Sequence, residues 1–211
     1  MEANEILNKL SSVQGRRDEE PNELLARELA EKGDQNSIAI LVEQLRNKNK
    51  RVQNDCIKVI YEIGAIKPEL ISDHGEVFLS ELNAKNNRIQ WGAMAALASI
   101  VHLRPDFIYE SLPVIMSVSD KGSVITRDGA FSILISLSAI PEYSDNTVNL
   151  VLEQLMNSQV NQLPMYAERA LAIAKDNRTD DFVAVIESRL TEVDKESKKK
   201  RLLKVLKKLS S

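Results

Sequence analysis

The sequence repeats itself about every 37 residues, and this repeat restricts the chain to folds in which similar units stack on one another. In the stretch 51–64, apolar side chains stand at Cys56, Val59, Ile60 and Ile63, which is the spacing of one helix face. Steps of 37 residues lead to three equivalent sets: Ala93, Ala96, Leu97 and Ile100; Ala130, Ile133, Leu134 and Leu137; and Ala167, Ala170, Leu171 and Ala174. All sixteen of these core positions are apolar, whereas an apolar content of 43% would fill about seven by chance.

The segments between these helices also have the apolar spacing of helices, so each unit is predicted to contain two of them. Asp34 and Asp145 are predicted N-caps, because a side-chain oxygen there can accept a hydrogen bond from the first turn. Pro68, Pro105 and Pro141 follow the second helices of successive units, where a proline stops the helix and the chain reverses. Only 7 glycines and 6 prolines in 211 residues disfavour an all-β sandwich with many tight turns.

We therefore predict one all-α solenoid domain over residues 1–211, built from stacked antiparallel helix pairs. The predicted units span residues 4–33, 36–66, 74–103, 107–139, 145–175 and 179–209. The first and last units fit the repeat only with shifted offsets, as is expected of units that cap the ends of the core.

The second helices of these units resemble those of HEAT repeats, within the wider class of HEAT and armadillo repeats. The tripeptides RVQ at 51–53 and RIQ at 88–90 open two of them with a basic and a β-branched residue, and residues 93–97 continue with small and aliphatic side chains. The resemblance implies a right-handed α-α superhelix of about five to six helix pairs, with the second helices lining a concave surface. It is nearly silent on activity.

The outward positions of the second helices are therefore candidates for contact with a partner. These positions differ chemically from unit to unit, whereas the core positions do not. The candidate groove residues are Asn54, Lys58, Trp91, Arg127, Asp128, Tyr166 and Arg169.

Trp91, the only tryptophan, has two interpretations. It is either an anchor in the groove, since tryptophan often dominates binding energy, or a packing residue that fills the space left by Gly92 across a unit boundary. Gly92 and Gly129 lie 37 residues apart inside helices, at the place that Asp55 holds in an earlier unit. They indicate either a close approach of two helices or access of a ligand to the backbone.

The chemistry-bearing residues do not predict a catalytic or metal site. The single cysteine, Cys56, stands at a core position, so it is predicted to be a buried small hydrophobe. His102 closes a helix, and His74 lies at a helix entry, where Asp73 and Glu76 lack an established metal-ligand spacing. No catalytic residue, metal or cofactor is predicted. The N-terminal residues lack the apolar core of a signal peptide and no stretch is long enough to span a membrane, so a cytoplasmic protein is expected.

The charge is unevenly distributed. Residues 195–211 contain eight basic residues and one acidic one, a local charge of +7, which leaves −10 on the rest of a chain whose total is −3. The last helix is either a cap with a polar outer face or a basic arm for an anionic partner. Its candidate basic patch consists of Lys198, Lys199, Lys200, Arg201, Lys204, Lys207 and Lys208.

These observations predict a non-catalytic scaffold that binds an unidentified protein or peptide on its second helices. The resemblance also admits an alternative, because some HEAT-like proteins of this size are DNA glycosylases with Trp and Asp near the lesion, as Trp91 and Asp128 would be. A further alternative is an accessory subunit that docks on nucleic acid through the basic last helix. The charge of −10 outside that helix disfavours nucleic acid as the partner.

Overall fold

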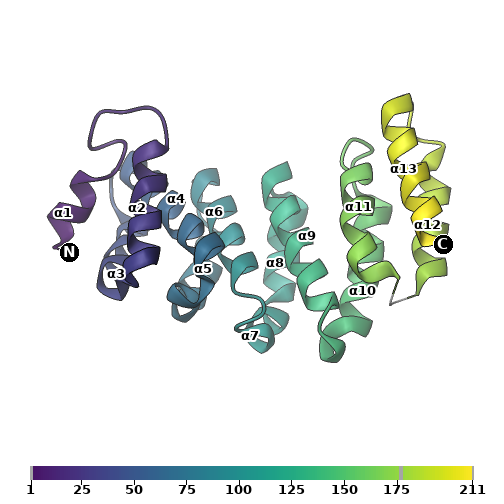
Figure 1. The fold of residues 1–211 in the computed structure, drawn as a ribbon, viewed down its shortest axis with the longest axis horizontal. Helices are drawn as coiled ribbons and strands as arrows, with labels where there is room; N and C mark the ends of the chain where they lie inside the picture. The colour runs from purple at the N-terminus through teal and green to yellow at the C-terminus, as the bar shows by residue number, and fades with distance from the viewer. Residues whose placement is uncertain (1, 176–177, 211) are drawn as a thin grey trace. The chain divides into compact units, whose positions relative to one another are not determined.

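The computed structural model describes residues 2–175 and 178–210, and this part of the chain contains helices and no strand (Figure 1). The chain divides into two compact units, residues 1–130 and 131–211, with the boundary inside helix α9 (Val124–Ser138). The prediction of an all-α chain is confirmed, and the grouping of all helix pairs into one solenoid domain stays a prediction.

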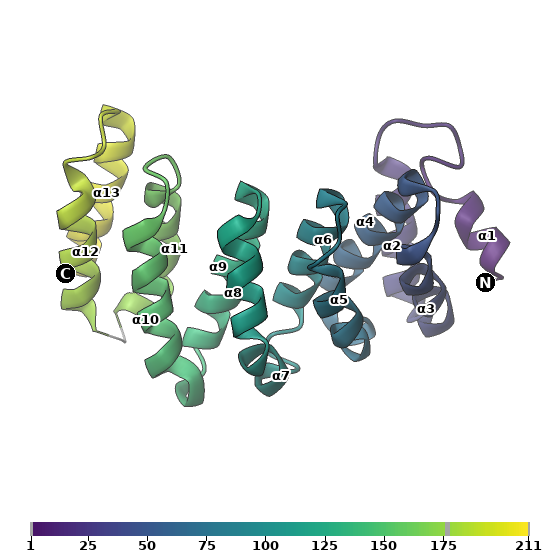
Figure 2. The same cartoon turned by 180° about the vertical axis from the view of Figure 1, so that it is seen from behind.

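The first unit contains eight α-helices and the N-terminal half of α9 among its described residues. Their bounds are α1 (Ala3–Asn8), α2 (Glu20–Lys32), α3 (Gln35–Glu43), α4 (Lys50–Ile66), α5 (Gly75–Glu81), α6 (Asn87–Ser99), α7 (Pro105–Glu110) and α8 (Leu112–Lys121). Short 3₁₀ turns lie at Gln44–Arg46, Pro68–Leu70 and Ser72–His74. Helix α4 packs between α2 and α6, while α3 packs on α4 and α5 packs on α6 (Figures 1 and 2).

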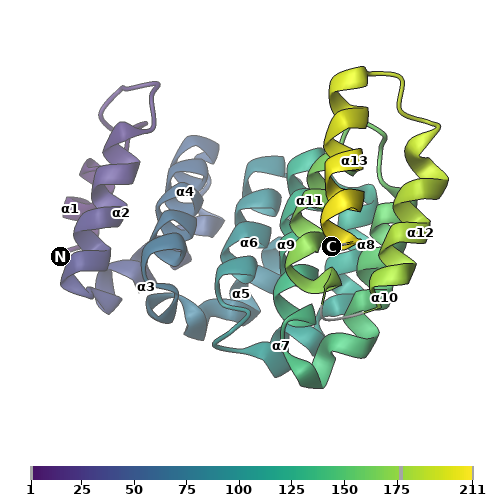
Figure 3. The same ribbon diagram turned by 45° about the vertical axis from the view of Figure 1, so that its right-hand side comes forward.

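The second unit continues α9 and adds four helices. These are α10 (Pro141–Asn157), α11 (Leu163–Ala174), α12 (Thr179–Leu190) and α13 (Glu196–Leu209). Helix α11 lies beside α13, and α10 lies beside α12 (Figure 3). Both units thus have second helices that pack on second helices, which is how a repeat chain buries faces that a single pair leaves open.

The helix boundaries follow the predicted signals with two differences. Asp34 caps α3 as predicted, because its carboxylate accepts a hydrogen bond of 3.0 Å from the backbone N–H of Ser37. The prediction that Asp145 is an N-cap is wrong, since Asp145 lies inside α10, which starts at Pro141. Proline suits the first position of a helix because its missing N–H would have no partner there.

The first helix of the unit after Pro105 is divided. Helix α7 ends at Glu110, and α8 begins at Leu112 with Pro113 in its first turn. Proline lacks the N–H that would continue the hydrogen bonding of α7, and its ring crowds the preceding turn. Ser111 stands between the two helices, and its hydroxyl donates to the carbonyl of Phe107 over 2.7 Å.

The repeated core positions are buried, as predicted, at fifteen of the sixteen places. Leu171 is the exception, because it is only half-buried. The buried face of α11 is turned toward Tyr166 and Ile173, and the Tyr166 ring stacks on Phe131 with the ring centroids 4.1 Å apart.

The two helical glycines allow close helix contacts. A Cβ atom at Gly92 would lie 2.5 Å from Cγ1 of Ile57 on α4, and one at Gly129 would lie 2.7 Å from Cγ of Met94 on α6. Both distances are shorter than carbon atoms tolerate, so the interpretation of these glycines as points of close approach is confirmed.

Arg189 is a buried cation that completes the end of a helix. The residue is 5% exposed, and its guanidinium donates to the carbonyls of Leu155 and Ser158 over 2.8 and 2.7 Å. These carbonyls belong to the end of α10 and its C-cap, where the helix itself supplies no donor. Glu192 accepts a further hydrogen bond of 2.7 Å from the same guanidinium.

We predict that Gly92→Ala destabilises the protein, although alanine favours helices by about 1 kcal/mol over glycine. The added methyl group would overlap Ile57, and overpacking of this kind typically lowers the free energy of unfolding by roughly 1–3 kcal/mol. Urea unfolding measures the change. In an Ile57→Ala background, which removes the overlapping atoms, the same substitution should be neutral or stabilising. Equal effects in both backgrounds would contradict the close approach.

We predict that Arg189→Met lowers the free energy of unfolding by roughly 2–4 kcal/mol, because buried carbonyls of α10 lose their donors. Glu192→Gln is the matched control. It removes only the ion pair at the exposed side, and we expect an effect of less than about 1 kcal/mol. If the two variants lower the free energy of unfolding equally, Arg189 stabilises the protein through its ion pair with Glu192 and not through its hydrogen bonds to the end of α10.

Candidate functional site

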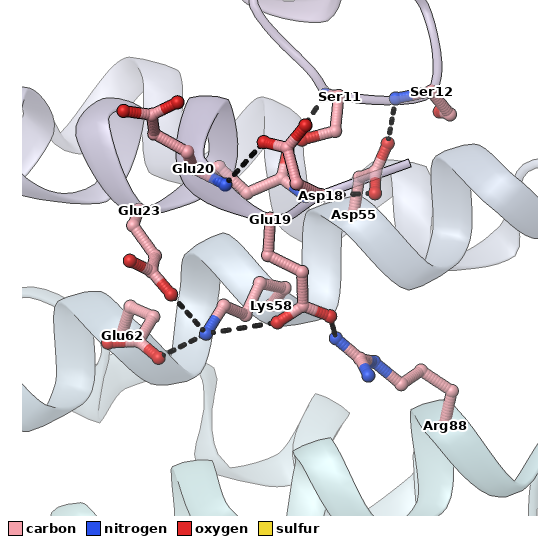
Figure 4. Close-up of polar contacts among 11 residues, drawn as sticks. Ser11, Ser12, Asp18, Glu19, Glu20, Glu23, Asp55, Lys58, Glu62 and Arg88 are labelled. Carbon is pink, nitrogen blue, oxygen red and sulfur yellow. Dashed lines mark hydrogen bonds and ion pairs between the residues drawn. The ribbon is translucent and has the colours of Figure 1, made fainter. Parts of the chain in front are cut away.

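The outward face of α4 carries a lysine whose ammonium group pairs with three carboxylates of the same chain. Lys58 is 6% exposed, and its Nζ lies 3.2 Å from Glu19, 3.2 Å from Glu23 and 2.6 Å from Glu62 (Figure 4). Glu19 precedes α2, Glu23 lies on α2, and Glu62 lies one turn further along α4. Lys58, a candidate groove residue, therefore joins α2 to α4 and leaves little surface for a partner.

The charges in this network support one another. Burial by itself would lower the pKa of Lys58, but the hydrogen bond to Glu62, together with those to Glu23 and Glu19, raises it well above its ordinary value. Burial would raise the pKa of Glu19, yet the hydrogen bond from Arg88 lowers it below its ordinary value of 4.5. The ammonium and the carboxylate therefore both stay ionised at neutral pH.

Arg88 extends the network to α6 and to two aromatic rings. Its guanidinium donates to Glu19 and lies over the Trp91 ring, 4.6 Å from the centroid. The Trp91 ring in turn lies 5.4 Å from that of Tyr61 on α4, and the Lys58 ammonium is 5.2 Å from the Tyr61 ring. Lys58, Tyr61, Arg88 and Trp91 thus form one cation–aromatic layer across α4 and α6, in which contact with the rings holds the cations in place.

Trp91 combines parts of its two interpretations. It is half-buried and packs across the boundary between two repeats against Tyr61. The space beside Gly92 is filled by Ile57 and not by Trp91. The ring keeps an exposed part that a partner can reach.

The loop before α2 is anchored on α4 by a carboxylate whose two oxygens are both used. Asp55 accepts a hydrogen bond of 2.8 Å from the backbone N–H of Ser12 and one of 2.9 Å from the side-chain amide of Asn22 (Figure 4). Asn22 accepts in turn from the backbone N–H of Ser11 over 3.0 Å. Sequence reasoning missed this anchor. The available signal was that Asp55 stands where the next two units have glycine.

A polar pocket of about 560 Å³ lies between this loop, α4 and α6. Loop residues between Ser11 and Glu19 form one wall, Arg51, Asn54 and Asp55 form the wall from α4, and Arg88 closes it from α6. Of the candidate groove residues, the structure brings Asn54 to this pocket, where Asn86 donates to its side chain over 2.8 Å.

The other candidate groove residues have separate surroundings. Arg127 donates to the carbonyls of Ser119 and Asp120 over 3.3 and 3.1 Å, which completes the end of α8. Asp128 is half-buried on α9.

In the second unit, Tyr166 is 3% exposed in its stack with Phe131, so it lies in the core. Arg169 donates to Ser132 and lies 5.2 Å from the Phe131 ring.

The basic patch on α13 is partly engaged within the second unit. Arg201 binds Glu168 on α11 with two hydrogen bonds of 2.8 and 2.6 Å, and Lys198 donates to Asn161. The opposite face buries Leu202, Val205 and Leu209. These contacts support the interpretation of α13 as a capping helix.

The chemistry-bearing residues lie apart from this pocket. Cys56 is fully buried, and burial raises the pKa of its thiol well above the ordinary value, so the thiol stays protonated. In the described ranges 2–175 and 178–210, no three His, Cys, Asp or Glu side chains are close enough together to hold a metal ion. Within the same ranges, no helix is both long and apolar enough to cross a bilayer.

We predict that Glu19→Gln lowers stability at neutral pH and that this loss disappears in acid. A carboxyl whose pKa is lowered on folding stabilises the fold above its ordinary pKa of 4.5, and this contribution is lost as the pH falls through the lowered value. Urea midpoints of the wild type and the variant, measured from about pH 7 down to about pH 3, test this. Glu31→Gln, at an exposed position on α2, should show no such dependence. A pH-independent difference would mean that the charge of Glu19 has no role.

Solved structures with repeat folds are similar to this chain over its whole length. A designed armadillo repeat protein in complex with the peptide (KR)4 is 15% identical with a TM-score of 0.62, and 99% of this chain and 100% of that chain are covered. A computationally designed armadillo repeat protein for modular peptide recognition is 16% identical with a TM-score of 0.61, covering 98% and 99%. An engineered protein is 19% identical with a TM-score of 0.59, covering 100% and 97%.

No family model and no curated protein sequence matches the chain. Identities as low as those of the solved structures show the fold alone. The fold is therefore the one that the sequence predicted, an all-α superhelical repeat of the HEAT/armadillo kind.

Proposed function

We propose that this protein is a non-catalytic scaffold that binds a segment of a protein partner on the second helices of its first unit. The observation that carries the proposal is the cation–aromatic layer on α4 and α6, which adjoins a pocket of about 560 Å³. Rigid aromatic and arginine side chains next to a recess are the residues that most often dominate binding energy at interfaces.

The surface is preformed, which favours binding of a flexible segment. Trp91 is held by contacts with the Tyr61 ring and with the Arg88 guanidinium. Side chains that are already fixed lose little conformational entropy when a ligand binds, so more of the interaction energy appears as affinity. The designed armadillo repeat protein solved with the peptide (KR)4 shows that a related fold can present peptide-binding surfaces.

The experiment is a selection of peptides from a displayed random library against the full-length protein, followed by affinity measurements. We predict that Trp91→Ala lowers the affinity for the selected peptides at least about tenfold, because it removes the central ring of the cation–aromatic layer. Val114→Ala, an exposed apolar residue on the first-helix side, is the control and should leave affinity unchanged. Thermal unfolding monitored by circular dichroism must show that both variants remain folded at the temperature of the assay.

A selection that yields no specific peptide would contradict the proposal. So would peptides that bind Trp91→Ala as tightly as the wild type, because their site would then lie elsewhere on the protein.

A further inference from the structure

The pocket beside the cation–aromatic layer has positive charge that the fold does not neutralise. Four arginines and three carboxylates line it. Each carboxylate has a partner: Asp18 pairs with Arg16 at 2.9 Å, Glu19 bridges Lys58 and Arg88, and Asp55 holds the loop. In the part of the chain that the structure describes, no hydrogen bond or ion pair engages the guanidinium of Arg17 or Arg51.

Further donors at the pocket are unsatisfied. The hydroxyl oxygens of Ser11 and Ser12 and the Nε of Arg88 are buried and have no partner among the described residues. Ser11 is 4% exposed, so water does not readily replace a missing partner there. Buried polar groups without partners are rare in folded proteins, and here they lie beside two unpaired guanidinium groups. The guanidinium groups of Arg17 and Arg51, which line the pocket, suit a ligand that brings acceptor oxygens.

The fold itself shows which acceptor this wall accommodates. The Glu19 carboxylate accepts a hydrogen bond from the Arg88 guanidinium, whose Cζ lies 4.6 Å from the centroid of the Trp91 ring. The guanidinium is planar by its own delocalisation and pairs best with an oxyanion that presents two oxygens, and contact with the ring orients it. Glu19 thus occupies the place that an acidic side chain of a partner would take.

The repeat confines this cationic wall to two helices. Arg51 and Arg88 lie 37 residues apart, each the second residue of its helix, and the N-caps Asn49 and Asn86 accept from their backbone N–H groups over 3.0 and 3.1 Å. The next equivalent residue, Ile125 on α9, is apolar and 54% exposed. Cations at the first two positions followed by an apolar one favour a segment with adjacent acidic residues over a uniformly charged polyanion.

We propose that this arginine pocket, formed by Arg17, Arg51 and Arg88, binds an acidic segment of a protein partner, and that Glu19 is a built-in competitor for it. The inference rests on the proposed function and names the chemistry of the partner. The acidic segment proposed here is opposite in charge to the basic peptide (KR)4 that the designed armadillo repeat protein binds.

The test uses the full-length protein and fluorescence anisotropy with labelled peptides of defined charge. We expect (Glu-Ser)4 to bind, while (Gln-Ser)4 and (KR)4 bind at least about tenfold more weakly. Arg51→Gln should lower the affinity for (Glu-Ser)4 about tenfold, because one charge-assisted contact is lost. Arg27→Gln is the control, since Arg27 is exposed on α2 outside the pocket, and it should bind like the wild type.

The competitor is tested by a substitution with the opposite sign. Glu19→Gln should strengthen binding of (Glu-Ser)4 by about threefold to tenfold, because it frees the guanidinium of Arg88. Glu23→Gln is the matched control: it removes one carboxylate from the same lysine but leaves Arg88 paired with Glu19. An equal gain in both variants would show a general effect of charge and would overturn the competitor role.

Three outcomes overturn the pocket assignment. They are equal binding of (Glu-Ser)4 by the wild type and Arg51→Gln, no binding of (Glu-Ser)4 by any variant, and tighter Arg51-dependent binding of an oligothymidylate than of the peptide. The display selection separates this failure from failure of the scaffold function. Selected peptides that are neutral or basic, depend on Trp91 and ignore Arg51 would retain the scaffold and reject the acidic segment.

Discussion

The structure of the first unit depends on how closely its second helices approach one another. Ile57 of α4 occupies the space beside Gly92 of α6, and Met94 of α6 occupies the space beside Gly129. This contact fixes the separation of the helices and therefore also the spacing of the side chains on their outer faces. Tyr61 and Trp91 meet, and Arg51 and Arg88 reach one pocket, because the core beneath them sets the helices at that distance.

A second layer of polar contacts is built on this apolar base. Asp55 holds the N-terminal loop through neutral donors, while Lys58 and Arg88 hold it through the charge of Glu19. The loop is thus tied to α4 and α6 at two places of different chemistry. Between them lies the pocket, so one set of contacts defines both the position of the loop and the shape of the candidate site.

The sequence predicted what the repeat encodes and missed what it does not. Core positions such as Ile60, Leu97 and Leu134 recur at a fixed interval, because every unit must bury the same helix face. Leu171 departs from this pattern, and the stacking of Phe131 on Tyr166 is not repeated in it. An aromatic pair of this kind leaves no periodic trace.

The candidate site was harder to predict for a related reason. Periodicity gives the direction in which Lys58 points, but it does not reveal that a loop from before α2 covers it. The contact between Ser12 and Asp55 joins residues 43 positions apart and occurs once. The sequence predicts Tyr166 as a groove residue of a second helix, yet it is only 3% exposed. Arg17 and Arg51 enter the site only because the loop folds back over α4.

The two attachments of the N-terminal loop differ in their response to ionic strength. Dissolved ions screen the pairing of Glu19 with Arg88, whose side chains are 41% and 28% exposed, but they have little effect on the hydrogen bonds that Asp55 accepts from amide groups. Raising the salt concentration therefore loosens one end of the segment and leaves the other fastened. The electrolyte around the protein therefore acts on the part of the loop near Glu19, while the part near Ser12 stays attached to Asp55.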